Sequence, residues 1–237
     1  MPSDTSSSQP RASAAAIAAS ARAYLFDMDG VLVANSDAHV EAWIEFMRRE
    51  HGLAPSAEFI RRCLGLTNHG YLKALLGREP SPEEVRRAVA EKERLYRELF
   101  GPKMAAPEGL VEFLRLAGAR GVPCAVASSA PVENIDFVLD GLSIRPFFQG
   151  IVHAEMVRRG KPAPDVYLRA AETLGVAPAD CVVFEDALAG IQSGRAAGAR
   201  VLGITSSYPA STLLAAEFPP DATFDRFAEL LPHSRTP

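Results

Sequence analysis

The stretch YLFDMDGVLV, residues 24–33, places two carboxylates, Asp27 and Asp29, at the end of an apolar run. Such a run predicts a strand that is covered on both faces. Removing a carboxylate from water is costly unless the group is paired, protonated or bound to a metal. The rest of the chain is therefore expected to bring a compensating positive charge to this strand end.

Short apolar runs and helix-length segments alternate along much of the chain. This alternation predicts an α/β fold with a doubly wound, Rossmann-like parallel sheet. The predicted helices between the strands span 108–120, 131–141, 164–175 and 187–198. The predicted strands are 23–28, 123–128, 150–154, 181–186, 200–205 and the short run 222–224.

Residues 36–103 interrupt this alternation, because they contain helical patterns and no predicted strand. One helix is predicted over HVEAWIEFM and ends at Gly52; another begins at Ser81, with Glu84 completing a capping box. The insert is too long for a loop. It therefore predicts a small α-helical cap domain, 36–103, within a core domain formed by 23–35 and 104–237. Its roots flank Asp27 and Asp29, so a cap there is placed to close over their ligand.

Composition and charge narrow the class of protein. The net charge of −4 and the scattered basic residues give no reason to expect a nucleic-acid partner, and no apolar run is long enough for a membrane span. Three widely spaced cysteines without a CxxC motif predict a reducing, cytoplasmic location. Residues 1–22, rich in Ser and Ala, predict a disordered tail. The oligomeric state stays open and is compatible with a monomer.

Four groups of polar residues fall at the ends of predicted strands, where open parallel sheets bind ligands. A cluster of up to four carboxylates needs a counter-charge, and hard oxygen ligands favour Mg²⁺, which also binds substrate phosphate. A lysine and a serine hydroxyl add donors for phosphoryl oxygens. The four groups are Asp27 with Asp29, Ser128 with Ser129, Lys161, and Glu185 with Asp186.

Four segments together resemble the motifs of the haloacid dehalogenase superfamily of phosphotransferases. They are FDMDGVL (26–32), VASS (126–129), GKPAPDVYL (160–168) and VFEDALAGIQSGRAAG (183–198). The resemblance extends over residues 23–225. It is strongest to the branch with a helical cap after the first motif, which includes β-phosphoglucomutase and phosphoglycolate phosphatase.

The resemblance implies a role for each matching residue. Asp27 would be the nucleophile that forms an aspartyl-phosphate, and Asp29 the general acid and then the base. Ser128, with Ser129 as the alternative hydroxyl, and Lys161 would hold the phosphoryl group, together with the backbone amides of Met28 and Asp29. The metal would be held by the Asp27 side chain, the Asp29 backbone carbonyl and Asp186, with Glu185 bound directly or through water.

The resemblance also implies substrate contacts from three residues of the insert, His39, Thr67 and Asn68, with a surface or capping role as the alternative for His39. Asn68 stands where β-phosphoglucomutases carry a phosphate-binding arginine, and an asparagine lacks the bidentate fork that holds a second phosphate. This difference argues against mutase activity.

The sequence thus predicts a Mg²⁺-dependent phosphatase that hydrolyses a small phosphorylated metabolite, such as a sugar phosphate, through an aspartyl-phosphate. The first alternative is a β-phosphoglucomutase-like sugar phosphomutase. A 2-haloacid dehalogenase is disfavoured because the second acid, Asp29, is present. A non-catalytic protein that binds a phosphorylated ligand on the same fold is the alternative from another class.

Overall fold

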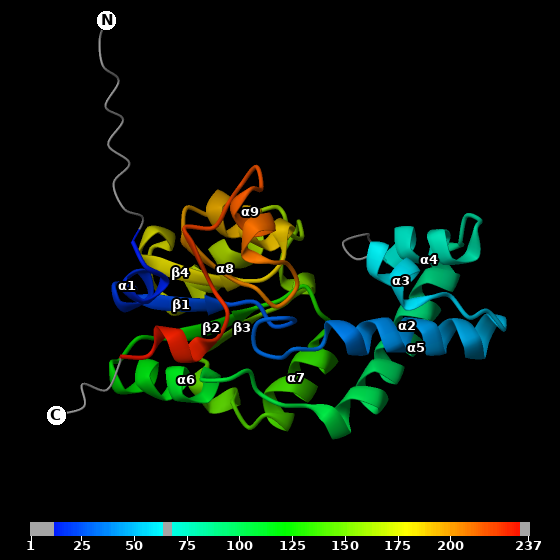
Figure 1. Cartoon of the computed structure of the whole chain (residues 1–237), viewed down its shortest axis with the longest axis horizontal. Coiled ribbons are helices and arrows are strands. Elements are labelled where there is room, and N and C mark those ends of the chain that lie inside the picture. Colours follow the sequence, from blue (N-terminus) through cyan, green and yellow to red (C-terminus); the bar gives the residue numbers. More distant parts are fainter. Residues whose placement is uncertain (1–11, 64–67, 233–237) are drawn as a thin grey trace, which may run out of the picture.

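The computed structural model describes residues 12–63 and 68–232, in which six strands form one parallel sheet (Figure 1). The predicted strands and the α/β class are confirmed. The strand order β3-β2-β1-β4-β5-β6 places β1 and β4 side by side at the centre of the sheet. The strands are β1 Ala23–Phe26, β2 Cys124–Ala127, β3 Gly150–Val152, β4 Cys181–Glu185, β5 Arg200–Ile204 and β6 Ala222–Phe224.

Helices cover both faces of the sheet, so neither side of the central strands meets water (Figure 1). On one face, Phe26 stacks on Phe184 of the neighbouring strand, and Phe113 packs against both rings. On the other face, Leu25 belongs to a cluster that includes Tyr167. The helices that follow the insert are α6 Leu110–Ala119, α7 Val132–Gly141, α8 Asp165–Leu174, α9 Leu188–Ala196 and α10 Ala210–Leu214.

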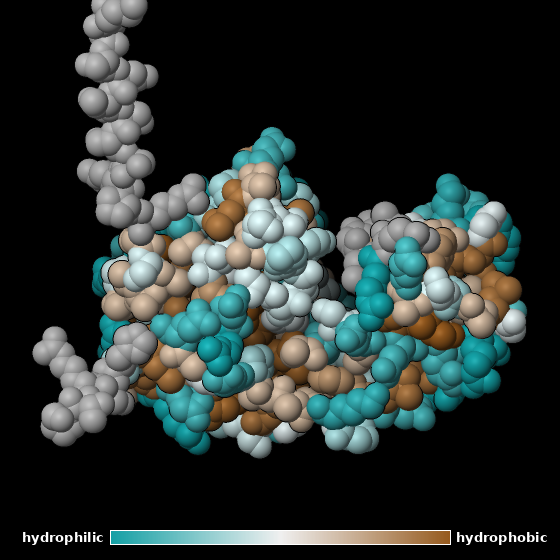
Figure 2. Space-filling model, in the orientation of Figure 1, coloured by the Kyte–Doolittle hydropathy of each residue, from teal (hydrophilic) through white to brown (hydrophobic). Residues whose placement is uncertain are grey.

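The described residues of the insert form helices only, as the periodicity predicted. They are α2 Ser36–His51, α3 Ala57–Arg62, α4 Asn68–Leu76 and α5 Pro82–Phe100. The capping box between Ser81 and Glu84 is present at the start of α5, and Gly52 ends α2 with φ 64°. Figure 1 shows these helices beyond the carboxyl end of β1, and the surface is indented between them and the sheet-bearing part (Figure 2). The division into cap and core domains at 36–103 stays a prediction.

The expected disordered tail over residues 1–22 is wrong for its second half. Residues Ala14–Ala19 form helix α1, which Ser13 caps by accepting a hydrogen bond from the Ala16 amide. Ile17 and Ala18 are buried, and the Tyr24 hydroxyl donates to the Ala18 carbonyl at 2.9 Å. Alanine has the highest helix propensity, and packing on the sheet supplies the stability that a six-residue helix lacks alone. Residues 1–11 lie outside the described part.

Short 3₁₀ segments complete the connections. They are η1 Gly101–Lys103, η2 Arg145–Phe147, η3 Ala154–Met156, η4 Pro178–Asp180 and η5 Phe227–Leu230, of which η5 packs beside α6.

No helix among the described residues is both long and apolar enough to cross a bilayer.

Candidate active site

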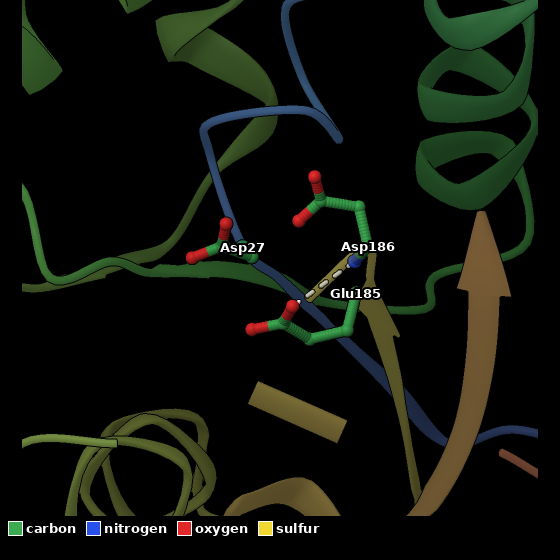
Figure 3. Close-up of side chains that lie close together, drawn as sticks. All are labelled: Asp27, Glu185 and Asp186. Carbon is green, nitrogen blue, oxygen red and sulfur yellow. Dashed lines mark hydrogen bonds between the residues drawn. The ribbon is translucent and has the colours of Figure 1, made fainter. Parts of the chain in front are cut away.

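Three of the predicted carboxylates meet where β1 and β4 end. Asp27 follows β1, while Glu185 ends β4 and Asp186 follows it, and the pairing of Phe26 with Phe184 brings these ends together. One oxygen from each of the three acids lies within 4.8 Å of the others, and all three residues are buried. Figure 3 shows the three carboxylates around a common space.

Lys161 supplies the positive charge that the opening stretch of sequence requires. Its Nζ donates to Asp27 Oδ1 at 2.5 Å and to Glu185 Oε1 at 2.6 Å. The lysine comes from the loop before α8, far from Asp27 in sequence, and its side chain is only 10% exposed. Because Lys161 Nζ lies within hydrogen-bond range of Asp27 Oδ1, both side chains are placed to act on one ligand.

The cluster holds more negative charge than one lysine balances. Burial raises the pKa of Asp27 well above its ordinary value; Lys161 opposes this rise, and the Glu185 and Asp186 carboxylates add to it. Burial, with Glu185 next, also raises the pKa of Asp186 to about 7. Burial alone would lower the pKa of Lys161, but Asp27 and Glu185 raise it instead. A further cation at this point would relieve the repulsion among the acids.

The donor set fits a hard divalent cation. All three clustered side chains offer carboxylate oxygens, and no histidine or cysteine is among them. Mg²⁺ is typically bound through one or two carboxylates, with water and substrate phosphate completing its coordination. The site therefore suits Mg²⁺ on the chemistry of its ligands.

The carboxylate of Asp29 lies outside this group of three and contacts a separate set of residues. Asn35 Nδ2 donates to Asp29 Oδ1 at 2.6 Å, and His39 Nε2 lies 3.7 Å from the same oxygen. The buried Lys92 of α5 contacts His39 Nδ1 at 2.8 Å. Burial alone would raise the pKa of Asp29, but the contacts with His39 and Asn35 and the charge of Lys92 lower it. The predicted metal ligand at Asp29 was its backbone carbonyl, and that role stays a prediction.

The backbone between Asp27 and Val33 forms a tight turn. The Met28 carbonyl accepts hydrogen bonds from the amides of Val31 and Leu32, and the Gly30 amide donates to the Val33 carbonyl. The amides of Met28 and Asp29 donate to no acceptor within residues 12–63 and 68–232. Two neighbouring amides without acceptors suit an anion, as predicted for the phosphate cradle.

The remaining predicted residues take different positions. Ser128 is buried directly after β2, and its Oγ accepts a hydrogen bond from the Ala130 amide at 3.0 Å, which leaves the hydroxyl proton free to donate. Ser129 is exposed. His39 stacks on Tyr96, with 4.1 Å between the ring centroids. Asn68 is the first residue of α4, and Thr67 lies outside the described residues.

Several residues that contact the acids were not predicted from the sequence. Ser207, in the loop after β5, donates to Asp186 Oδ2, and Ser206 donates to the Gly30 carbonyl at 2.6 Å. Both serines follow the carboxyl end of β5, so the rule that parallel sheets bind ligands at the carboxyl ends of their strands could have identified them. Tyr167 donates to Glu185 Oε1 at 2.8 Å from α8, and its position inside a helix gave no such signal.

The fold and this arrangement of acids and lysine agree with the comparison with protein families. Residues 21–198 match the model of the haloacid dehalogenase-like hydrolases, so the chain belongs to this family. The resemblance inferred from the four motifs is thereby confirmed.

Curated relatives and solved structures support the same assignment. Hexitol phosphatase A of Escherichia coli is 36% identical over 195 residues, which cover 81% of this chain and 85% of that protein. The chloroplastic 5-amino-6-(5-phospho-D-ribitylamino)uracil phosphatase of Arabidopsis thaliana is 30% identical over 81% of this chain, which spans only 52% of that longer protein. A family IA, variant 3 hydrolase of Entamoeba histolytica superposes with a TM-score of 0.83 at 29% identity, covering 88% of this chain and 95% of its own.

Proposed function

We propose that this protein is a Mg²⁺-dependent phosphatase that hydrolyses a small phosphorylated metabolite through an aspartyl-phosphate. The contact that supports this most directly joins Lys161 Nζ to Asp27 Oδ1 at 2.5 Å. It sets a cation beside a carboxylate in a buried acidic cluster at the carboxyl ends of the strands. Positive charge beside a nucleophilic carboxylate is the arrangement that phosphoryl transfer to that carboxylate needs.

In the first step, a carboxylate oxygen of Asp27 attacks phosphorus, and the bond from phosphorus to the leaving oxygen breaks. Asp29 gives a proton to that oxygen, so the product leaves as a neutral alcohol. Lys161, the Ser128 hydroxyl and the free amides of Met28 and Asp29 bind the phosphoryl oxygens.

In the second step, Asp29, now ionised, takes a proton from water, and the water oxygen attacks the phosphorus of the aspartyl-phosphate. The bond between phosphorus and Asp27 breaks, which releases inorganic phosphate, frees the Asp27 carboxylate and leaves Asp29 protonated, as at the start of the cycle. The contacts from Asn35 and His39 lower the pKa of Asp29 and so favour the ionised form that this step uses. One residue thus acts as acid and then as base.

Asp27 and Asp186 would hold the Mg²⁺ ion, with the Asp29 carbonyl and with Glu185 nearby. When bound, the ion neutralises charge on the acids and on the phosphoryl oxygens. This requirement agrees with the raised pKa of Asp27 and of Asp186, which burial and the neighbouring carboxylates produce.

The substrate class proposed is a phosphate ester of a sugar, polyol or similar small molecule. Hexitol phosphatase A is named for such a substrate and is 36% identical to this chain. The helices α2–α5 would act as a cap that closes over the ester, excludes water and selects the leaving group. A cytoplasmic location, and the absence of nucleic-acid and membrane partners, remain expectations of the same proposal.

A sugar phosphomutase would use the same acids, and Asn68 is the residue that argues against it. Conversion of β-glucose 1-phosphate in the presence of a bisphosphate activator separates the two activities. Turnover of that substrate to glucose 6-phosphate would replace the phosphatase proposal with the mutase. Metal-dependent binding of a phosphorylated ligand without turnover would favour the non-catalytic alternative.

The direct test is hydrolysis of an aryl phosphate by the whole chain with Mg²⁺, with chelator, and in the Asp27→Asn variant. We expect chelator to abolish the activity and Asp27→Asn to lower kcat by about a thousandfold or more. Asp180→Asn is the matched control, because Asp180 directly precedes β4 at the amino end of that strand, whereas the clustered acids lie at its carboxyl end, and it pairs with Arg22. Activity that survives in Asp27→Asn would refute the nucleophile assignment.

A further inference from the structure

The Glu185 carboxylate is fully hydrogen-bonded in the described structure. Its Oε1 accepts from Lys161 Nζ at 2.6 Å and from the Tyr167 hydroxyl at 2.8 Å. Its Oε2 accepts from the amides of Asp186 and Ala187, each at 3.0 Å (Figure 3 shows the first of these). A carboxylate has about four lone-pair sites, so these four donors occupy its capacity.

Asp27 differs from Glu185 in this respect. One oxygen of Asp27 accepts from Lys161, while Oδ2 has no donor among the described residues. Within residues 12–63 and 68–232, Asp186 accepts from Ser207 through Oδ2, and its Oδ1 has no donor. The oxygens available to a cation without the loss of a hydrogen bond therefore belong to Asp27 and Asp186, and not to Glu185.

Tyr167 holds Glu185 Oε1 in the position where that oxygen also accepts from Lys161. Its side chain is fully buried in α8, and its ring lies under the lysine, with 4.9 Å from Lys161 Nζ to the ring centroid. Gly190 of α9 lies against the same carboxylate, because a methyl group there would come 1.7 Å from Glu185 Oε1. The Glu185 carboxylate is thus held by the Tyr167 hydroxyl and two backbone amides and is packed against Gly190. Lys161 is its fourth hydrogen-bond donor.

We propose that Tyr167 is a positioning residue that fixes Glu185 as the anchor of Lys161, and that Glu185 is not a direct ligand of the metal. The Tyr167 hydroxyl holds Oε1 where it can share the lysine with Asp27. Lys161 then stays within 2.5 Å of Asp27 and in reach of the phosphoryl group. This inference rests on the proposed phosphatase function.

The test compares Tyr167→Phe with Tyr24→Phe in the full-length chain. Both variants delete one buried hydroxyl in the same α/β core, but the Tyr24 hydroxyl donates to the Ala18 carbonyl, away from the acids. Three quantities are measured for each: kcat and KM for an aryl phosphate, the apparent Kd for inorganic phosphate, and the apparent Kd for Mg²⁺. The two binding constants come from thermal shifts and need no turnover.

In Tyr167→Phe we expect kcat to fall by about tenfold or more, and the affinity for inorganic phosphate to fall with it, since both depend on Lys161. The Mg²⁺ affinity should stay at the wild-type value. Tyr24→Phe should change neither kcat nor either affinity, although both variants lower Tm. A Tyr167→Phe protein with wild-type kcat and phosphate affinity would overturn the role of Tyr167.

A loss of Mg²⁺ affinity in Tyr167→Phe would overturn the assignment of Glu185 as an anchor and make it a metal ligand. Gly190→Ala displaces the same carboxylate through the added methyl group, so it provides a second test if Tyr167→Phe does not fold. It should likewise weaken phosphate binding more than Mg²⁺ binding. If the wild-type protein neither hydrolyses the ester nor binds phosphate, the proposed function itself fails, and this outcome is distinct from a Tyr167→Phe variant that matches an active wild type.

Discussion

Gly30 lies directly against the carboxylate of Asp186. A methyl group at position 30 would come 1.9 Å from Asp186 Oδ2, and Gly30 also has φ 76°, a conformation that side chains disfavour. The turn after the first strand therefore needs glycine for two reasons, one in its own backbone and one in the acid from β4 that packs on it. This contact ties the two acidic segments into one site.

Gly30→Ala should abolish most of the Mg²⁺-dependent activity, because Asp186 must move to make room for the methyl group. Gly52→Ala is the matched control: Gly52 has φ 64°, yet nothing lies within 4 Å of the added methyl group. Both substitutions cost about 1–2 kcal/mol for the left-handed backbone, so Tm should fall in both, and further in Gly30→Ala because of the added contact with Asp186. Only Gly30→Ala should lose Mg²⁺ affinity in a thermal-shift titration. Equal Mg²⁺ affinities in the two variants would contradict this account.

Ser207→Ala should weaken Mg²⁺ binding. The Ser207 hydroxyl donates to Asp186 Oδ2 and so fixes which oxygen the carboxylate turns toward the cluster. Loss of a residue that orients a metal ligand typically costs about 10–100-fold in metal affinity, and we expect a fall near the lower end because Ser207 is itself exposed. The apparent Kd for Mg²⁺ is measured by thermal shift. Ser211→Ala, an exposed serine at the start of α10, is the control that should leave it unchanged.

The sequence was sufficient to predict the sheet and the meeting of its acids. Near-continuous apolar runs such as CVVFE (181–185) fixed the strands, and the rule that ligands bind at strand ends brought Asp27, Asp186 and Lys161 together. These inferences hold because they depend on periodicity and on topology. Neither requires knowledge of a particular side-chain contact.

The parts that the sequence did not predict depend on contacts between distant segments. Helix α1 is too short and too poor in large apolar residues to be recognised, and it forms because Ala18 and Ile17 pack on the core. In the sequence, Tyr167 cannot be distinguished from the other residues on the buried face of α8. Only the structure shows that its hydroxyl donates to Glu185. Asn35 precedes a helix as a cap residue would, yet its side chain makes no capping bond and donates to Asp29 instead.

Mg²⁺ should stabilise the protein more at high pH than at low pH. The folded state keeps a proton on Asp186 up to about pH 7, whereas an unfolded aspartate loses it near 3.8. Without metal, the free energy of unfolding should therefore fall as the pH rises from about 4 through about 7, by at most about 1.4 kcal/mol per pH unit for this group. Burial also raises the pKa of Asp27 well above its ordinary value, so Asp27 too lowers the free energy of unfolding as the pH rises.

The measurement is Tm at pH 5.5 and at pH 8, with chelator and with Mg²⁺. We expect the increase in Tm on adding Mg²⁺ to be larger at pH 8, because the ion replaces the protons that the acids must lose. Asp186→Asn should flatten the pH dependence in chelator. A Tm increase that is the same at both pH values would show that the buried acids do not bind the ion.

Asn35→Ala should shift the titration of Asp29 to higher pH. The amide of Asn35 donates to Asp29 Oδ1 at 2.6 Å, and this contact, with the contact from His39 and the charge of Lys92, lowers the pKa of Asp29 against the effect of burial. Removing the donor leaves burial less opposed, so the pKa should rise. The limb of the kcat/KM profile that Asp29 controls should then move toward neutral pH.

Asn134→Ala is the control, because Asn134 is also a buried asparagine but its amide group contacts Glu93 and Arg97 of α5. This substitution removes hydrogen bonds between α5 and α7 but none to Asp29. The value of kcat/KM can therefore change, but its pH profile should keep the wild-type midpoint. If both variants shift the profile by the same amount, the cause is a loosened contact between α5 and the sheet-bearing part. If Asn35→Ala alone shifts it, the Asn35 amide sets the charge state of the residue that protonates the leaving group.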